Sequence, residues 1–148
     1  MKEKMKSAII IMLITCAAGF TSCKNKDTTT PTLVCTGGSG GNVTMVAYLY
    51  HHDSLIVNKR NYRDTVFVKF NTQNLPGTHA SNYDAVFVGD SISNNVHLTG
   101  LKCGNYYIYG VGLDTITSPG LPFRVSGGIP FSTSTISGEI TLHVPVTE

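Results

Sequence analysis

Apolar residues recur at every second position through much of the chain, and this period limits the fold more than any other feature of the sequence. They alternate with other residues from Val43 to Leu49, and again from Ile140 to Val146. Successive residues of a strand point to opposite faces of a sheet, so the pattern predicts strands with one buried face. No segment after Cys23 shows the 3.6-residue period of an amphipathic helix. The chain is therefore expected to be all-β.

Turn residues separate the predicted strands. Besides the two segments above, strands are expected at 55–57, 65–70, 85–88, 96–98 and 106–113, and loops with Pro-Gly pairs at 71–82 and 118–122. Gly110 and Gly112 interrupt a tyrosine-rich strand, which indicates a bulge or a close backbone approach. About seven short strands in a chain long enough to bury a core favour a single sandwich of two packed sheets.

The first 22 residues have the pattern of an export signal. A lysine-rich start precedes an apolar run at 7–18 that is too short to span a bilayer comfortably. Residues 20–23, Phe-Thr-Ser-Cys, resemble the lipobox of bacterial lipoproteins. The resemblance implies cleavage before Cys23 and acylation of that cysteine, which would anchor the chain to a membrane. An uncleaved anchor and an ordinary secreted protein are the alternatives, and Cys16 is a rival lipidation site.

Three parts of the chain follow from this interpretation: a signal peptide at 1–22, a lipidated cysteine with a flexible tether at 23–41, and a sandwich domain at 42–148. Charged, Thr-rich and Gly-rich stretches predict the tether. The whole chain has 11 Lys and Arg against 9 Asp and Glu, and the signal peptide holds three lysines and one glutamate, which leaves eight of each sign. A neutral domain gives no reason to expect nucleic acid as a partner.

Two cysteines remain after processing, Cys35 and Cys103. Export places them in an oxidising compartment, where two remaining thiols tend to pair. A disulfide between them would fix the tether to the domain. The alternative is two free thiols, because the sequence does not supply the Cα separation of roughly 4.4–6.8 Å that a disulfide requires.

The segment Gly100–Asp114 carries a resemblance to a known family. Its first ten residues read G-L-K-C-G-N-Y-Y-I-Y, which is similar to the G-L-x-x-G-x-Y turn and strand of transthyretin-like (prealbumin-like) domains, including CnaB-type and carboxypeptidase-regulatory-type modules. The resemblance implies an immunoglobulin- or transthyretin-like sandwich. The chain also resembles a group of short Bacteroidota lipoproteins, and the matching stretches are Gly40-Gly41, His51–Asp53, Tyr106–Gly110, Gly127–Pro130 and Pro145–Glu148.

The residues of this chain give little support for the activities found in the domains that it resembles. An isopeptide bond of the CnaB type joins a lysine to an asparagine in the last strand, and Lys69 is a strand lysine, but 139–146 contains no asparagine. The hydroxyisourate hydrolases end in Tyr-Arg-Gly-Ser, whereas this chain ends in Pro-Val-Thr-Glu. Cys103 has no histidine near it in the sequence, as an activated nucleophile would need. We therefore expect no catalytic residues, no cofactor and no enzyme activity.

One cluster of metal-ligand residue types occurs, at His51, His52 and Asp53. Adjacent strand residues point to opposite faces, so the two imidazoles converge only if a turn bends them together. A polar hairpin turn is the simpler interpretation, and no zinc-ligand spacing is present. Metal binding by His51 and His52 stays an alternative hypothesis.

Several tyrosines could form a stacking surface for sugars. Alternation places only part of the set on any one face, and packing in the core or across strands is the commoner use of such residues. An exposed row on a flat face would favour glycan binding, and buried rings would remove the case. The residues concerned are Tyr48, Tyr50, Tyr106, Tyr107 and Tyr109.

Five of the six aspartates precede a serine or threonine that is followed by an apolar residue or threonine. This pattern is similar to the O-glycosylation sequon of exported Bacteroidota proteins, which implies five candidate acceptors. The structural alternative is a turn that ends at the aspartate, is capped by the hydroxyl and leads into a strand. The candidate acceptors are Thr28, Ser54, Thr65, Ser91 and Thr115.

The sequence thus predicts a lipid-anchored, non-enzymatic module of the cell envelope with a structural or adhesive role. Its expected location is the outer membrane, on a face left open, and its expected partner is an envelope protein or glycan. A surface glycan-binding lipoprotein of a polysaccharide uptake system is the first alternative, and the His51 and His52 metal site is the second.

Overall fold

The computed structural model describes residues 34–59, 61–116 and 121–148. The predicted signal peptide, Cys23 and Thr28 lie outside these residues. Eight strands and one short 3-10 helix make up the described part of the chain: β1 (Ser39–His51), β2 (Ser54–Leu55), β3 (Thr65–Phe70), η1 (Ala80–Asn82), β4 (Ala85–Val88), β5 (Val96–Leu101), β6 (Gly104–Asp114), β7 (Phe123–Thr133) and β8 (Ser137–Pro145).

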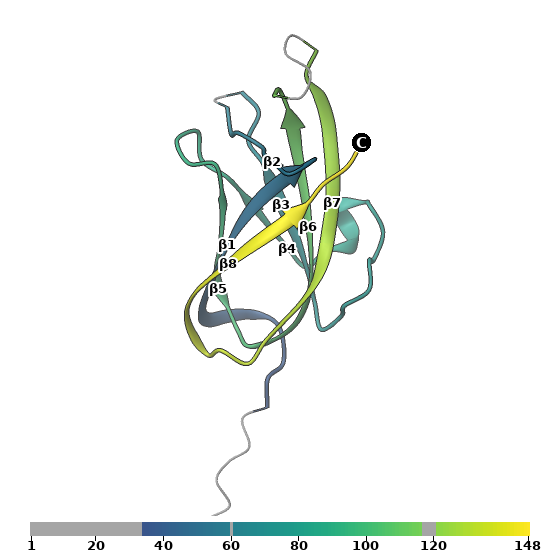
Figure 1. Ribbon diagram of the computed structural model, residues 1–148. Helices are drawn as coiled ribbons and strands as arrows, with labels where there is room; N and C mark the ends of the chain where they lie inside the picture. Colours follow the sequence, from purple (N-terminus) through teal and green to yellow (C-terminus); the bar gives the residue numbers. More distant parts are fainter. Residues whose placement is uncertain (1–33, 60, 117–120) are drawn as a thin grey trace, which may run out of the picture. The chain divides into compact units, whose positions relative to one another are not determined.

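The strands form the predicted all-β sandwich of two sheets. In the first sheet, β1 pairs antiparallel with β5 and β2 and parallel with β8. Figure 1 shows β1 and β8 side by side and pointing the same way. The second sheet is antiparallel throughout, in the order β4-β3-β6-β7. Two backbone hydrogen bonds between Ser126 and Thr147, of 2.8 and 2.9 Å, join β7 to the segment after β8, so the two sheets meet along this edge.

The core confirms the alternation seen in the sequence. Every second side chain of β1, from Val43 to Leu49, is fully buried, as are Leu142 and Val144 of β8. Val66 and Ile108 meet them from the second sheet, within one cluster of buried residues. Each strand therefore stabilises the fold through the apolar area that one of its faces removes from water, about 25 cal/mol for each Å².

Two glycines of β6 leave space for side chains of the core. A Cβ at Gly110 would lie 3.0 Å from Cγ of Leu49, and one at Gly112 would lie 2.8 Å from Oδ1 of Asp64. The pairing of β6 with β7 passes both positions without a shift in register. Of the two structures that the sequence left open, the close approach is therefore present and the bulge is not.

Strand β7 was not expected from the sequence. Gly127, Gly128 and Pro130 lower its strand propensity, and only the loop before it was predicted. A Cβ at Gly127 would lie 2.5 Å from the carbonyl oxygen of Pro145, so this glycine allows the C-terminal segment to pair with β7. Pro130 is exposed. The glycine that lowers the strand propensity is thus required by close packing against the C-terminal segment, and the proline is tolerated because it lies at the exposed edge of the sheet.

The domain begins earlier than predicted. Strand β1 starts at Ser39, inside the segment 23–41 that was interpreted as a flexible tether. Ser39 and Val43 both pair with Leu101, across an irregularity in the ladder. The glycines at 37–41 therefore belong to the domain, where they permit close backbone contacts.

Candidate functional site

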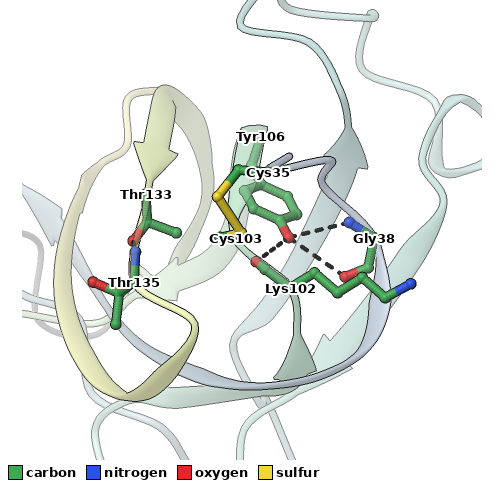
Figure 2. Close-up of a disulfide and its surroundings, with 7 residues drawn as sticks. All are labelled: Cys35, Gly38, Lys102, Cys103, Tyr106, Thr133 and Thr135. Atoms are coloured by element: carbon green, nitrogen blue, oxygen red, sulfur yellow. Dashed lines mark hydrogen bonds between the residues drawn. A yellow bond between two sulfur atoms is a disulfide. The ribbon is translucent and has the colours of Figure 1, made fainter. Parts of the chain in front are cut away.

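A disulfide joins Cys35 to Cys103, which are 68 positions apart in the sequence and have their Cα atoms 4.9 Å apart (Figure 2). Cys35 precedes β1, and Cys103 lies in the turn from β5 to β6. We call this end of the sandwich the tether end. The opposite end, where β1 and β6 finish and β3 starts, is the far end.

The disulfide is reinforced by hydrogen bonds to the same N-terminal segment. The buried Tyr106 hydroxyl donates to the carbonyl of Lys102 at 2.6 Å and accepts from the backbone N–H of Gly38 at 3.1 Å (Figure 2). The backbone turns at Gly104, whose φ of 146° is rare for other residues, and a Cβ there would overlap the backbone of Gly37. We call these residues together the N-terminal clamp, which fixes the start of the domain to the second sheet. It consists of the Cys35–Cys103 disulfide with Gly37, Gly38, Lys102, Gly104 and Tyr106.

The turn brings the rings of the two candidate metal ligands together, with their centroids 4.1 Å apart. His51 is buried at the far end, with Nδ1 2.7 Å from Oδ2 of Asp114, and the ring of Phe123 packs against it edge-on at 5.5 Å. His52 is exposed in the turn, with its ring stacked on that of His51. Within the described residues, no group of three His, Cys, Asp or Glu side chains is arranged to hold a metal ion. The geometry makes His51 a paired core histidine.

A second buried acid lies near this pair. Asp64 precedes β3, and its side chain faces Gly112 and Ile56 in the core. Its backbone N–H donates to Oδ1 of Asn58 at 2.6 Å, but its carboxylate oxygens have no hydrogen-bond partner among the described residues. Burial therefore raises the pKa of Asp64 from its ordinary value of 3.8 to about 6.

The four described glycosylation candidates all lie at the far end, because each stands where a strand starts or finishes there. Ser91 is exposed, whereas Ser54, Thr65 and Thr115 are half-buried. The preceding aspartates also act as turn caps: Asp90 accepts backbone N–H groups from residues 92 and 93 at 2.7 Å, and Asp114 accepts one from residue 116 at 2.7 Å. At these two sites the turn therefore starts at the aspartate and is capped by its carboxylate, which differs from the structural alternative of a hydroxyl cap that leads into a strand.

The tyrosines do not form the exposed row that sugar stacking would need. Tyr106 belongs to the core, and Tyr107 and Tyr109 are buried in a second cluster with Tyr83. Tyr48 and Tyr50 are half-buried, and both rings contact that of His143. The observation that would have favoured glycan binding is therefore missing from the described residues.

The outer face of the second sheet is instead apolar. On β4, Val86 is 52% exposed and Val88 is 59% exposed, and half-buried apolar residues continue this face across β3 and β6. The outer face of the first sheet carries polar residues such as Thr99, Thr141 and His143. Since an outward sheet face is usually polar, the apolar one indicates a contact surface.

Two hollows of about 270 and 440 Å³ open on this apolar face. Val111 of β6 and Arg124 of β7 line both, so the hollows lie next to each other. We call them together the sheet groove. It is lined chiefly by Tyr62, Arg63, Phe67, Tyr109, Val111, Leu113 and Arg124.

Both arginines of the sheet groove are exposed, and neither forms an ion pair with a described residue. Nearby carboxylates are engaged elsewhere. Asp84 pairs with Lys69 at 2.8 Å and accepts the backbone N–H of Phe70, while hydrogen bonds from its own turn lower the pKa of Asp90. The groove therefore combines an apolar floor with uncompensated positive charge.

Sequence reasoning did not find the sheet groove. The one signal of the apolar face on which it opens was the run at 85–88, where all four residues are apolar although a half-buried strand needs only two. None of these four residues lines the groove itself. The contribution of Arg124 depends on β7 lying beside β6, and β7 was not predicted.

Comparison with known proteins adds no relative. The chain matches no protein-family profile, no curated protein and no solved structure. Within the described ranges, no helix has the length and apolar character that crossing a bilayer requires.

Proposed function

We propose that the chain is a lipid-anchored, non-enzymatic module of the cell envelope that binds another protein through the sheet groove. The lipobox resemblance at residues 20–23 supports the anchor. The apolar face of the second sheet supports the binding role, and the sheet groove on it is the observation that carries the proposal. The transthyretin-like resemblance of Gly100–Asp114 agrees with a non-enzymatic sandwich.

The N-terminal clamp suits a domain that is held at one end. Cys35 is the described cysteine nearest to the proposed lipid site, and its disulfide leads to the turn between β5 and β6. A pull on the tether would therefore be shared between β1 and the second sheet. The sheet groove reaches toward the far end through Arg63 and Leu113, so a partner bound there would lie away from the attachment point.

Replacing Cys23 with alanine is expected to abolish lipidation and release the protein from membranes. Intact mass spectrometry of the protein from its native envelope should give a mass that starts at Cys23 and includes acyl chains. Cys16→Ala should leave this mass unchanged, since Cys16 falls in the removed signal. An unacylated mass, or continued membrane association of Cys23→Ala, would refute the anchor. Hexose-rich increments in the same spectrum would report glycosylation.

A photo-crosslinking side chain at Tyr62 is expected to capture a discrete envelope protein in cells. Tyr62 is 59% exposed and lines the groove, so benzoylphenylalanine replaces one exposed aromatic ring with another. The same replacement at His143, on the outer face of the first sheet, should give no matching adduct. Arg124→Glu should weaken the Tyr62 adduct. Identical adduct patterns from Tyr62 and His143 would argue against the sheet groove as the binding surface.

A further inference from the structure

The spacing of side chains in the sheet groove fits an extended chain. Tyr109 and Val111 line the larger hollow, and Val111 and Leu113 line the smaller one. Outward residues of a strand repeat every two positions, or roughly 7 Å. The hollows are therefore one two-residue repeat apart along β6, which is the spacing of same-face side chains in an extended peptide laid along the strand.

The charge of the sheet groove selects for anions. Arg124 lines both hollows and Arg63 lines the smaller one, and no acidic residue lines either. Guanidinium groups bind carboxylates through two parallel hydrogen bonds, so each arginine can hold a carboxylate of the partner. An apolar floor with arginines above it matches an extended segment that carries carboxylates beside apolar side chains.

A polypeptide fits this surface better than an acidic sugar does. Sugar rings stack on exposed, flat aromatic faces and need many polar groups to bind their hydroxyls. Among the described lining residues Tyr62 is exposed, but Tyr109 is buried and the ring of Phe67 packs against that of Tyr83 at 5.6 Å, so the groove offers one exposed ring and no row. Hydroxyl groups among the described lining residues are few: Tyr62, Thr65, Thr78, Tyr109 and Ser126.

We propose that the sheet groove binds an extended acidic segment of a partner protein, with alternate apolar side chains in the two hollows and flanking carboxylates on Arg63 and Arg124. This inference rests on the proposed function and names the chemistry of the partner.

The test is a nuclear magnetic resonance titration of the full mature chain in neutral detergent micelles. The probes are the acetylated peptide Gly-Glu-Ser-Val-Ser-Leu-Ser-Glu-Gly-amide, which places both glutamates on the same face as the valine and leucine, and its twin with lysine at each glutamate. The acidic peptide should shift the amide signals of Val111 and Leu113 but not those of Thr99 and Thr141. The lysine twin should bind about tenfold more weakly, since it loses the ion pairs with both arginines and places like charges beside them.

Charge-reversed variants make the result specific. Arg124→Glu should lower the affinity for the acidic peptide by about tenfold, and it should reduce or invert the preference for this peptide over the lysine twin. Lys102→Glu makes the same charge change at an exposed site on the tether end and should leave binding unchanged. Equal binding of the two peptides, or shifts outside the groove, would overturn the inference of an acidic peptide. If a Tyr62 adduct still formed in cells, the proposed function would stand.

Two further outcomes would assign the groove to another occupant. Shifts caused by trigalacturonate but not by the acidic peptide would make the ligand an acidic glycan. Shifts that appear on raising the protein concentration alone would make it a second copy of this chain. Either result contradicts the peptide proposal.

Discussion

Removing the disulfide with the double change Cys35→Ser and Cys103→Ser is expected to lower the free energy of unfolding by about 4 kcal/mol. The crosslink spans 68 residues, and a loop of that length loses much of its freedom in the unfolded chain when its ends are joined. For a domain of this size the melting temperature should fall by roughly 15 °C. Changing both cysteines avoids an unpaired thiol that could form dimers.

The measurement is chemical or thermal unfolding of the mature chain in detergent, with and without reductant. Reduced wild-type protein should match the double variant, and reductant should not alter the double variant. A loss of less than about 1 kcal/mol would mean that joining Cys35 to Cys103 does little to restrict the unfolded chain. The N-terminal segment would then be held in the folded domain mainly by other contacts, such as the hydrogen bonds of Tyr106.

Local sequence patterns predicted most of the fold. The strands predicted at 65–70 and 85–88 have the bounds of β3 and β4, because each is a short run of β-branched and aromatic residues between turn signals. The same rules missed β7, whose Gly127 and Gly128 are set by backbones that approach from β8 and β6. Such contacts join segments far apart in sequence, and period and propensity do not report them.

The candidate site was harder to predict than the fold. Its floor comes from the outward residues of β6, whose alternation was visible, but their role depends on which sheet face stays uncovered. The sequence likewise offered His51, His52 and Asp53 as a cluster, whereas the partner of His51 is Asp114, 63 residues further on. Pairing of this kind follows from topology rather than from spacing along the chain.

Asp64 is expected to make the domain less stable as the pH rises from about 4 to about 7. Its pKa is 3.8 in ordinary surroundings and about 6 in the folded domain, so the folded state holds a proton that the unfolded chain has already lost. Stability from this group is therefore present at acid pH and is lost as the pH rises through 6. The loss between pH 4.5 and pH 7.5 should be roughly 2 kcal/mol.

Asp64→Asn isolates this effect, because an amide of nearly the same shape does not ionise. As the pH is raised from 4.5 to 7.5, the free energy of unfolding of the variant should increase relative to that of the wild type by roughly 2 kcal/mol. The measurement is the difference in denaturant midpoints at matched slopes. The buried pair of His51 and Asp114 is present in both proteins, so it does not distinguish them.

Asp90→Asn provides the control with the opposite sign. Backbone hydrogen bonds from Ser93 and Ile92 lower the pKa of Asp90, so its stabilising contribution is present above pH 4 and is lost as the pH falls. Relative to the wild type, Asp90→Asn should therefore be least stable at neutral pH, where Asp64→Asn is most stable. If Asp64→Asn and the wild type kept a constant difference across the range, the Asp64 carboxylate would have to be stabilised in its charged form. It would then hold a partner beyond the described residues, and its burial would no longer make stability depend on pH.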